Sequence, residues 1–292
     1  MLQSCTQPRT SPYATTCHAA MSRDLFIDSK SPRTGLDLPE LWRHRELFVV
    51  LIQRDIAVRY QETTLGALWA VLQPLGLMAI FAIVFGRIAG MSTGTVPYPL
   101  FALAGLLPWL FFASSLQASG TSVLNSRDLI SKVYFPRLLI PLTAICTPLA
   151  DLCVSSVLML VLMLCYGMPL TLHLLMIPPL ALIAALAAAG AGSLIAALSV
   201  AYRDFRHVLP FLITAWMFLT PVIYPPAMVP GRWHWLLLLN PMAGVVDGMR
   251  SAWFGLAFDF ELISISALLA MLLFWCGIRY FRSVERRFVD LL

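Results

Sequence analysis

Long apolar segments alternate with short polar ones along most of the chain. A helix that spans a bilayer needs about 20 mostly apolar residues, and six segments meet or approach this length, the fifth being at the lower edge. They cover residues 66–86, 98–118, 138–166, 174–200, 208–224 and 261–281. The pattern therefore predicts an all-α polytopic membrane protein with six transmembrane helices.

Three regions between or before these segments are too polar or too short to span. Residues 41–62 surround a short apolar core with arginines, which favours a helix lying at the cytoplasmic membrane interface. Residues 119–137 form a polar connection, with a short helix expected around 124–134. Residues 225–260 contain four prolines and a short leucine run. They favour re-entrant half-helices on the outer side, where irregular backbone is tolerated against protein or a cavity.

The chain before these regions has a different character. Residues 1–37 are polar, contain Ser, Thr and Pro, and lack the apolar core of a signal peptide. We expect a disordered cytoplasmic tail here, with translation starting at Met1 or at Met21. The transmembrane domain is predicted to occupy residues 38–292.

The basic residues predict the orientation of this domain. The chain has a net charge of +5, and with the N-terminus inside, 17 of its 20 Lys and Arg residues lie in predicted cytoplasmic segments. An excess of basic residues is typical of cytoplasmic loops, so both termini are predicted to be cytoplasmic. The bases are spread over four segments and form no single stripe, which disfavours nucleic acid as a partner.

Composition supports the membrane interpretation and removes several other classes of protein. Hydrophobic residues make up 59% of the chain and charged residues only 12%, whereas soluble domains average about 25% charged residues. The six cysteines form no CxxC pair and have no metal-ligand spacing, so we expect packing roles and no metal site. No phosphate-binding loop and no hydrolase motif is present. The chain is therefore predicted to contain no phosphate-loop ATPase site, no recognisable hydrolase site and no cofactor of its own.

Asp151 is the acidic residue that lies most clearly inside a predicted span. An intramembrane acid often has a functional role, but this carboxylate can equally hydrogen-bond a neighbouring helix or face a wet cavity. A proton-coupled transporter usually contains several such groups, so the sequence disfavours that class.

Five ordered segments resemble the ABC-2 permeases that export polysaccharides. They are YQETTLGALWAVLQPL (60–75), YPLFALAGLLPWLFF (98–112), LISKVYFPRLLIPL (129–142), AYRDFRHVLPFLITAWMFLTPVIYP (201–225) and LNPMAGVVDGMR (239–250). The resemblance covers about residues 40–290, and it does not specify the glycan, because O-antigen, capsule and teichoic acid permeases share these segments.

The resemblance implies a homodimer in the bacterial inner membrane, in which each subunit has six spans behind an interfacial helix. It also implies two copies of a separate ATPase, which would hold ATP and Mg. The implied substrate is a glycan on an undecaprenyl diphosphate carrier, made in the cytoplasm and moved outward.

The resemblance also indicates where the ATPase would bind. Short cytoplasmic helices between spans couple the ATPase to the membrane domain in this family, and residues 124–137 and 202–207 are the matching segments. The candidate contacts are Arg127, Asp128, Lys132 and Tyr134 in the first segment and Arg203 and Asp204 in the second. The alternatives are an ordinary solvated loop for the first segment and charges that only set topology for the second.

Aromatic side chains are the candidates for lining a glycan channel, because sugars stack on aromatic faces and a moving polymer needs many weak contacts. These candidates are Tyr60, Trp69, Trp109, Phe112, Trp216, Phe218 and Tyr224. Tyr60 and Trp69 rank highest because they flank the first span near the cytoplasmic entrance. Each aromatic can instead face lipid, the protein core or the membrane interface, where Trp and Tyr gather.

Two further groups of residues are candidates for the ends of the channel. Arg54 and Arg59 on the interfacial helix can steer a diphosphate headgroup, although contact with anionic lipids explains them equally well. The predicted external gate contains Trp233, Trp235, Asn240 and Arg250. The tryptophans can instead be interface anchors. Asn240 is expected to cap a helix that begins at Pro241. Arg250 can meet a phosphate or a sugar, but a pair with Asp247 three residues earlier is favoured.

Three functions remain open, and the permease subunit of an ATP-driven polysaccharide exporter is favoured. The second is an ABC-2 permease for a drug, a lipid or another small amphiphile. The third is a membrane-embedded glycan-lipid transferase, which would need acids or histidines clustered at one membrane face. The histidines outside the tail, at positions 44, 173, 207 and 234, are dispersed along the chain.

Overall fold

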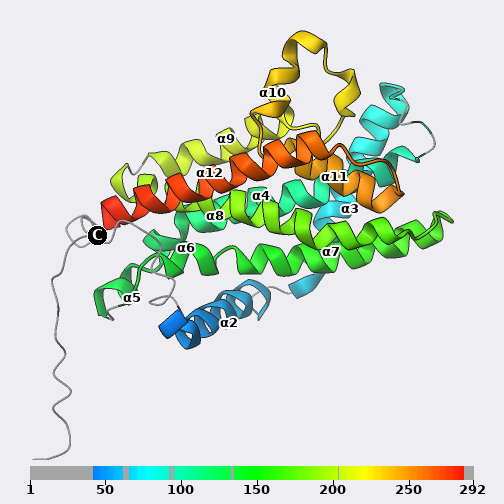
Figure 1. Cartoon of the computed structure of the whole chain (residues 1–292). Coiled ribbons are helices and arrows are strands. Elements are labelled where there is room, and N and C mark those ends of the chain that lie inside the picture. Colours follow the sequence, from blue (N-terminus) through cyan, green and yellow to red (C-terminus); the bar gives the residue numbers. More distant parts are fainter. Residues whose placement is uncertain are drawn as a thin grey trace, which may run out of the picture. The chain divides into compact units, whose positions relative to one another are not determined.

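The computed structural model describes residues 42–61, 66–91, 94, 96–132, 135–202 and 204–285, and every regular element among them is a helix (Figure 1). The α-helices are α2 (Arg45–Gln61), α3 (Trp69–Phe81), α4 (Tyr98–Asn125), α5 (Arg127–Lys132), α6 (Leu139–Thr143), α7 (Cys146–Cys165), α8 (Ile177–Ala201), α9 (Phe205–Leu219), α10 (His234–Leu238), α11 (Ala243–Phe254) and α12 (Phe260–Val284). A π-helix, η2 (Ala82–Ile88), continues α3. Short 3-10 turns are η1 (Gly66–Leu68), η3 (Leu172–Met176), η4 (Pro226–Met228) and η5 (Gly231–Trp233). The all-α prediction is confirmed for the described residues, and the predicted tail lies outside them.

Five helical segments are long and apolar enough to cross a membrane. They are Trp69–Ile88, Tyr98–Asn125, Leu139–Cys165, Leu172–Ala201 and Phe260–Val284. These segments agree with five of the six predicted spans, although the second continues further, to Asn125. The described helices are therefore consistent with a multi-pass membrane protein.

The predicted fifth span is shorter than expected. α9 has 15 residues, so at 1.5 Å per residue it extends only about 22 Å, less than the roughly 30 Å hydrocarbon core of a bilayer. The helix ends before the expected boundary at residue 224 because Pro221 disfavours helical backbone at the residue before it. Thr220 is accordingly extended, with φ −96° and ψ 138°.

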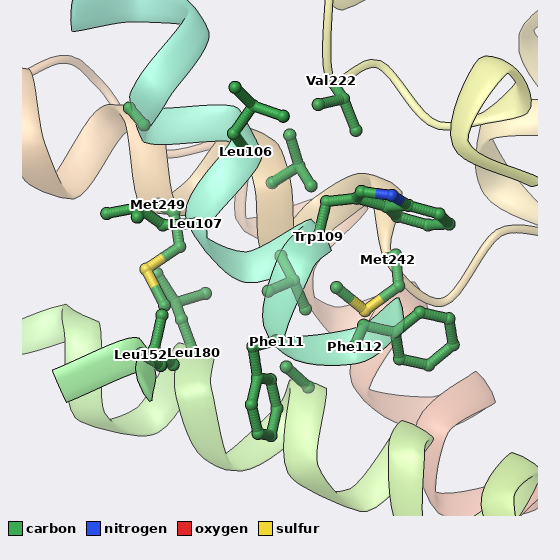
Figure 2. Packing of buried hydrophobic residues seen from close by; sticks show 14 of the residues in the cluster. Leu106, Leu107, Trp109, Phe111, Phe112, Leu152, Leu180, Val222, Met242 and Met249 are labelled. Atoms are coloured by element: carbon green, nitrogen blue, oxygen red, sulfur yellow. The ribbon is translucent and has the colours of Figure 1, made fainter. Parts of the chain in front are cut away.

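The central helix of the bundle is α4. In the most apolar part of its span 78% of the residues are buried, compared with 11% for the segment formed by α3 and η2. α4 contacts α3, α7, α8, α9 and α11. Figure 2 shows the core that these helices form, including Leu107, Phe111, Leu152 and Leu180. α3 therefore keeps a large apolar surface that the described chain does not cover.

Small residues allow α8 and α12 to pack with their backbones almost in contact. A Cβ atom added at Gly190 would lie 2.4 Å from the backbone of Leu273, and one added at Gly277 would lie 2.0 Å from the carbonyl oxygen of Gly190. Real Cβ atoms do not approach other atoms so closely. Small residues are typical of such crossings between membrane helices, where close van der Waals packing drives association.

The helices connect at two ends of the bundle. The α5 end holds α5, α6 and the last turn of α12, and it lies at the left in Figure 1. There the backbone N–H of Arg137 donates to Glu285 Oε1 (3.0 Å), and Arg137 Nη1 donates to the carbonyl oxygen of Glu285 (2.6 Å). The α11 end holds η3, α10, α11 and the connection that follows α9.

α2 packs at the α5 end, against α6 and α7. Leu47 and Phe48 pack on an apolar cluster that includes Phe135, Leu139 and Phe281. The helix predicted around residues 41–62 is therefore present as α2, and its N-terminal half is anchored by apolar contacts.

Candidate functional site

Asp151 on the second turn of α7 binds two consecutive residues at the end of α2. Arg59 Nη2 lies 2.6 Å from Asp151 Oδ2, and the hydroxyl of Tyr60 donates a hydrogen bond to Asp151 Oδ1. The side chain of Asp151 is 17% exposed and that of Arg59 39%. One carboxylate therefore satisfies a cation and a hydroxyl, so Asp151 forms the interhelical contact that was one alternative from the sequence.

Ser155 lies one turn further along α7, on the same face as Asp151, since residues i and i+4 are neighbours on a helix. Its hydroxyl donates to the carbonyl oxygen of Ala70 at the start of α3 (3.0 Å). α7 thus holds the end of α2 with one polar side chain and the start of α3 with the next. We call Arg59, Tyr60, Asp151 and Ser155 the α7 latch.

A small polar cavity adjoins the latch between α3, α4 and α7. Its volume is about 30 Å³ and its polar lining comes from Arg59, Gln73, Ser114, Asp151 and Ser155. A cavity volume of roughly 10–15 Å³ is enough to hold one water molecule. The cavity is therefore large enough for a water molecule beside the carboxylate and far too small for a sugar.

The pKa of Tyr60 is raised to about 12, firstly because burial disfavours the phenolate and secondly because the hydroxyl donates to Asp151. The charge of Asp151 acts in the same direction, and Arg59 opposes it. The hydroxyl of Tyr60 therefore remains protonated, and able to donate, throughout the neutral pH range.

A second polar cluster lies at the α11 end, where Asn240 binds the end of α9. Asn240 Oδ1 accepts hydrogen bonds from Trp216 Nε1 (3.2 Å) and from the backbone N–H of Met242 (3.0 Å). Asn240 Nδ2 donates to Thr220 Oγ1 (2.8 Å). α11 begins at Ala243, two residues later than expected, and a turn at Pro241 and Met242 precedes it.

Arg250 on α11 binds the chain just after α9. Its Nη2 donates to the carbonyl oxygen of Val222 (2.6 Å) and its Nη1 to that of Tyr224 (3.4 Å). The guanidinium also lies 3.9 Å from the ring centroid of Phe101, within the range of a cation–π interaction. The expected pair with Asp247 is replaced by these carbonyl contacts, because the buried carbonyls that follow α9 need donors.

Arg250 is only 2% exposed, and burial lowers its pKa to about 10, so the guanidinium remains charged at neutral pH. Gly105 on α4 makes room for it. A Cβ atom added at Gly105 would lie 2.6 Å from Arg250 Nη2 and 2.8 Å from the carbonyl oxygen of Val222. We call Asn240 and Arg250 the α9 clasp, since both hold residues 216–224.

The candidate ATPase contacts are partly described. Arg127, Asp128 and Lys132 are exposed on or beside α5, and Asp204 is exposed just before α9. Tyr134 and Arg203 lie outside the described residues. The described members thus have the exposure that a contact surface requires, and all belong to the α5 end.

The candidate channel aromatics divide by burial. Trp109 and Phe112 are buried in the core, as Figure 2 shows, and Phe112 stacks edge-on against Trp216 with a centroid distance of 5.1 Å. This packing argues against a channel role for these two side chains. Exposed members are Trp69 on α3, Phe218 on α9 and, in the gate segment, Trp233 and Trp235.

Three remaining candidates have polar partners within the chain. The hydroxyl of Tyr224 donates to the carbonyl oxygen of Phe218 (3.2 Å), and Tyr60 belongs to the α7 latch. Arg54 pairs with the neighbouring Asp55 (2.8 Å) on its own helix. Sequence reasoning missed Ser155 and Gly105, because only the relative placement of helices reveals what these small side chains contact.

The chain matches known proteins over most of its length. Residues 46–254 match the ABC-2 type transporter family. O-antigen export system permease protein RfbA from Myxococcus xanthus is 31% identical over 254 residues, covering 86% of this chain and 97% of that protein. A protein of the same name from Klebsiella pneumoniae is 30% identical, with 85% and 95% covered. Polysialic acid transport protein KpsM from Escherichia coli is 27% identical, with 69% and 79% covered. The α7 latch and the α9 clasp both lie inside the family match.

Proposed function

Because this chain belongs to the ABC-2 type transporter family, we propose that it is the permease subunit of an ATP-driven exporter of a lipid-linked polysaccharide. The observation that carries this proposal is the 31% identity to an O-antigen export permease over 97% of that protein's length. A second relative is named for transport of polysialic acid, so both names concern a polysaccharide. The cargo class is therefore proposed as O-antigen, capsule or a similar glycan on undecaprenyl diphosphate.

The proposed orientation places the α5 end in the cytoplasm and the α11 end outside. Its support is the charge distribution, with 17 basic residues on one predicted side and 3 on the other. α9 would complete the sixth crossing together with residues 220–224, whose irregular backbone is held by the α9 clasp. Such backbone is tolerated at membrane depth where protein groups satisfy it. α10 and α11 would then form the re-entrant outer segment of a protein of the inner membrane.

The proposed energy source is a separate ATPase that docks at the α5 end, with ATP and Mg bound on that partner chain. The support is the absence of a phosphate-binding loop from the sequence and the exposure of Arg127, Asp128 and Lys132. We expect Arg127→Glu to reduce co-purification of the ATPase while the permease still accumulates in the membrane. Arg232→Glu, an exposed arginine near α10, is the matched control, and equal losses in both variants would contradict the docking site.

The proposed channel forms between two copies of the chain. Its support is the apolar surface of α3 and α9, which carry exposed side chains such as Trp69, Phe211 and Phe218 that a single copy leaves uncovered. Trp69, Phe218 and Tyr224 are the preferred contacts for sugars, and Trp233 and Trp235 would border the exit. Arg54 and Arg59 would meet the diphosphate headgroup at the entrance, where each already has a carboxylate partner.

Deletion of the gene followed by glycan analysis tests the proposal. We expect surface polysaccharide to disappear and carrier-linked glycan to accumulate inside the cell, with both effects reversed by the wild-type gene. Unchanged surface polysaccharide would contradict polysaccharide export and would favour a permease for a drug or lipid. Loss of surface glycan without intracellular carrier-linked glycan would instead indicate a step before export.

A further inference from the structure

The polar contacts of α7 converge on one joint of the chain. α2 ends at Gln61 and the helical lead into α3 begins at Gly66, so Tyr60 and Ala70 flank the joint on its two sides. Asp151 binds the first side and Ser155 binds the second. Two side chains one turn apart on a single helix therefore hold both helices that meet at the joint.

The two halves of α2 are held by different forces. Leu47, Phe48 and Leu51 anchor the first half by apolar packing. Arg54, in the middle, pairs with Asp55 on its own helix and, within the part of the chain that the structure describes, ties α2 to no other element. Arg59 and Tyr60 at the end reach across to another helix. The position of the end of α2 thus depends on the carboxylate of Asp151.

We infer that Asp151 is a positioning residue of the entrance. Together with Ser155 it fixes the angle between α2 and α3, and it keeps the guanidinium of Arg59 turned toward the bundle. This inference rests on the proposed function, because the entrance is the place where a lipid-linked glycan would pass between α2 and the spans. The contact with Asp151 engages Nη2 of Arg59, so it also limits how much of the guanidinium is available to a phosphate of that carrier.

The position of Arg59 can be measured without any transport assay. Phenylglyoxal modifies accessible arginine side chains, and peptide mass spectrometry of the full chain in native membranes separates Arg59 from Arg54. Releasing a partly exposed ion pair worth up to about 1 kcal/mol corresponds to a threefold to fivefold gain in the free side chain. We expect Asp151→Asn to increase modification of Arg59 by about that factor and to leave Arg54, whose partner is unchanged, as it was.

The consequence for export is measured by complementing the deletion strain. We expect Asp151→Asn and Ser155→Ala to reduce surface polysaccharide several-fold at an unchanged level of permease in the membrane. The matched controls are Gln53→Ala, at an exposed residue of α2, and Ser156→Ala, since the Ser156 hydroxyl donates to the carbonyl oxygen of Leu152 on its own helix (2.7 Å).

The outcomes separate this inference from the proposed function. Unchanged Arg59 modification in Asp151→Asn overturns the inference, whatever happens to polysaccharide. Equal export defects in the controls and in the latch variants overturn it too. If the wild-type gene exports no polysaccharide, the proposed function fails, while the modification of Arg59 still decides whether Asp151 positions it. If the Asp151→Asn protein does not accumulate in the membrane, Tyr60→Phe takes its place, because it removes only the hydroxyl that donates to Asp151. Modification of Arg59 by phenylglyoxal is then measured in that variant.

Discussion

The α7 latch and the α9 clasp both hold a helix end against the bundle through polar side chains, but the groups that make the contacts differ. The latch joins Arg59 and Tyr60 to the carboxylate of Asp151 at a partly exposed site. In the clasp, Arg250 is buried and donates to backbone carbonyls. A side-chain pair open to water exchanges its partners at little cost, whereas a buried donor to backbone leaves unpaired groups behind when it departs.

The comparison indicates which end of the molecule can move. Opening the clasp would leave the carbonyl oxygens of Val222 and Tyr224 without donors in an apolar setting, and each unsatisfied group costs about 1–3 kcal/mol. Opening the latch exposes Arg59 and Asp151 to water, where exposed ion pairs are worth at most about 1 kcal/mol. We therefore expect the clasp to be permanent and the latch to open during function.

The largest effect should come from breaking the clasp with Arg250→Met. Methionine fills much of the space but donates no hydrogen bond. The buried carbonyl of Val222 and the partly buried carbonyl of Tyr224 lose their partner, so stability should fall by about 3 kcal/mol. Thermal unfolding of the purified protein in detergent measures this loss. Arg232→Met, at an exposed arginine of the same external segment, should leave the Tm unchanged. Similar Tm values for the two variants would mean that the clasp does not hold the end of α9.

A smaller loss should follow from crowding the clasp with Gly105→Ala. The added methyl would lie 2.6 Å from Arg250 Nη2 and 2.8 Å from a backbone carbonyl oxygen, and overpacking of this kind costs about 1–3 kcal/mol. Gly76→Ala on α3 is the matched control because a Cβ there meets nothing within 4 Å. That control should be neutral or stabilising, since alanine favours helices by up to about 1 kcal/mol over glycine. Equal Tm shifts in both variants would refute the close approach at Gly105.

The length of the apolar runs was sufficient to predict most of the fold. The five long spans follow from uninterrupted apolar runs, which a bilayer requires to be helical. The end of α9 was predicted too late, although Pro221, which causes it, is present in the sequence. A criterion based on the length of apolar runs does not take a single proline into account. α11 illustrates a different limit, since its burial among α4, α8 and α12 depends on tertiary packing that no local pattern encodes.

The polar contacts were less predictable than the spans. Asp151 was singled out because an acid inside a span is conspicuous, but its partners lie 91 and 92 positions earlier in the chain. Arg250 was expected to pair with Asp247 because helix neighbours are the only partners that sequence can offer. The carbonyl oxygens it actually binds belong to irregular backbone after α9, and that backbone is visible only in the structure.

A local effect should follow from weakening the latch with Tyr60→Phe. This change removes one hydrogen bond to a carboxylate at a partly exposed site, worth about 1 kcal/mol, so the Tm should change little. Hydrogen exchange should nevertheless become about fivefold faster in the last turn of α2, because the end of that helix loses a contact. Exchange in the first half of α2, anchored by Leu47 and Phe48, should not change. Uniform acceleration along α2 would show that the hydroxyl supports the whole helix and not its end.

The smallest effect concerns pH. The pKa of Tyr60 is about 12 in the folded chain and about 10 in an unfolded one, so between pH 7 and 9 both states keep the proton. Above pH 10 the unfolded state loses its proton first, so stability from this group falls as pH rises toward 12. The difference in Tm between wild type and Tyr60→Phe should therefore be constant from pH 7 to 9 and shrink above 10. A difference that already shrinks at pH 8 would mean that Tyr60 is neither buried nor bonded to Asp151 as described.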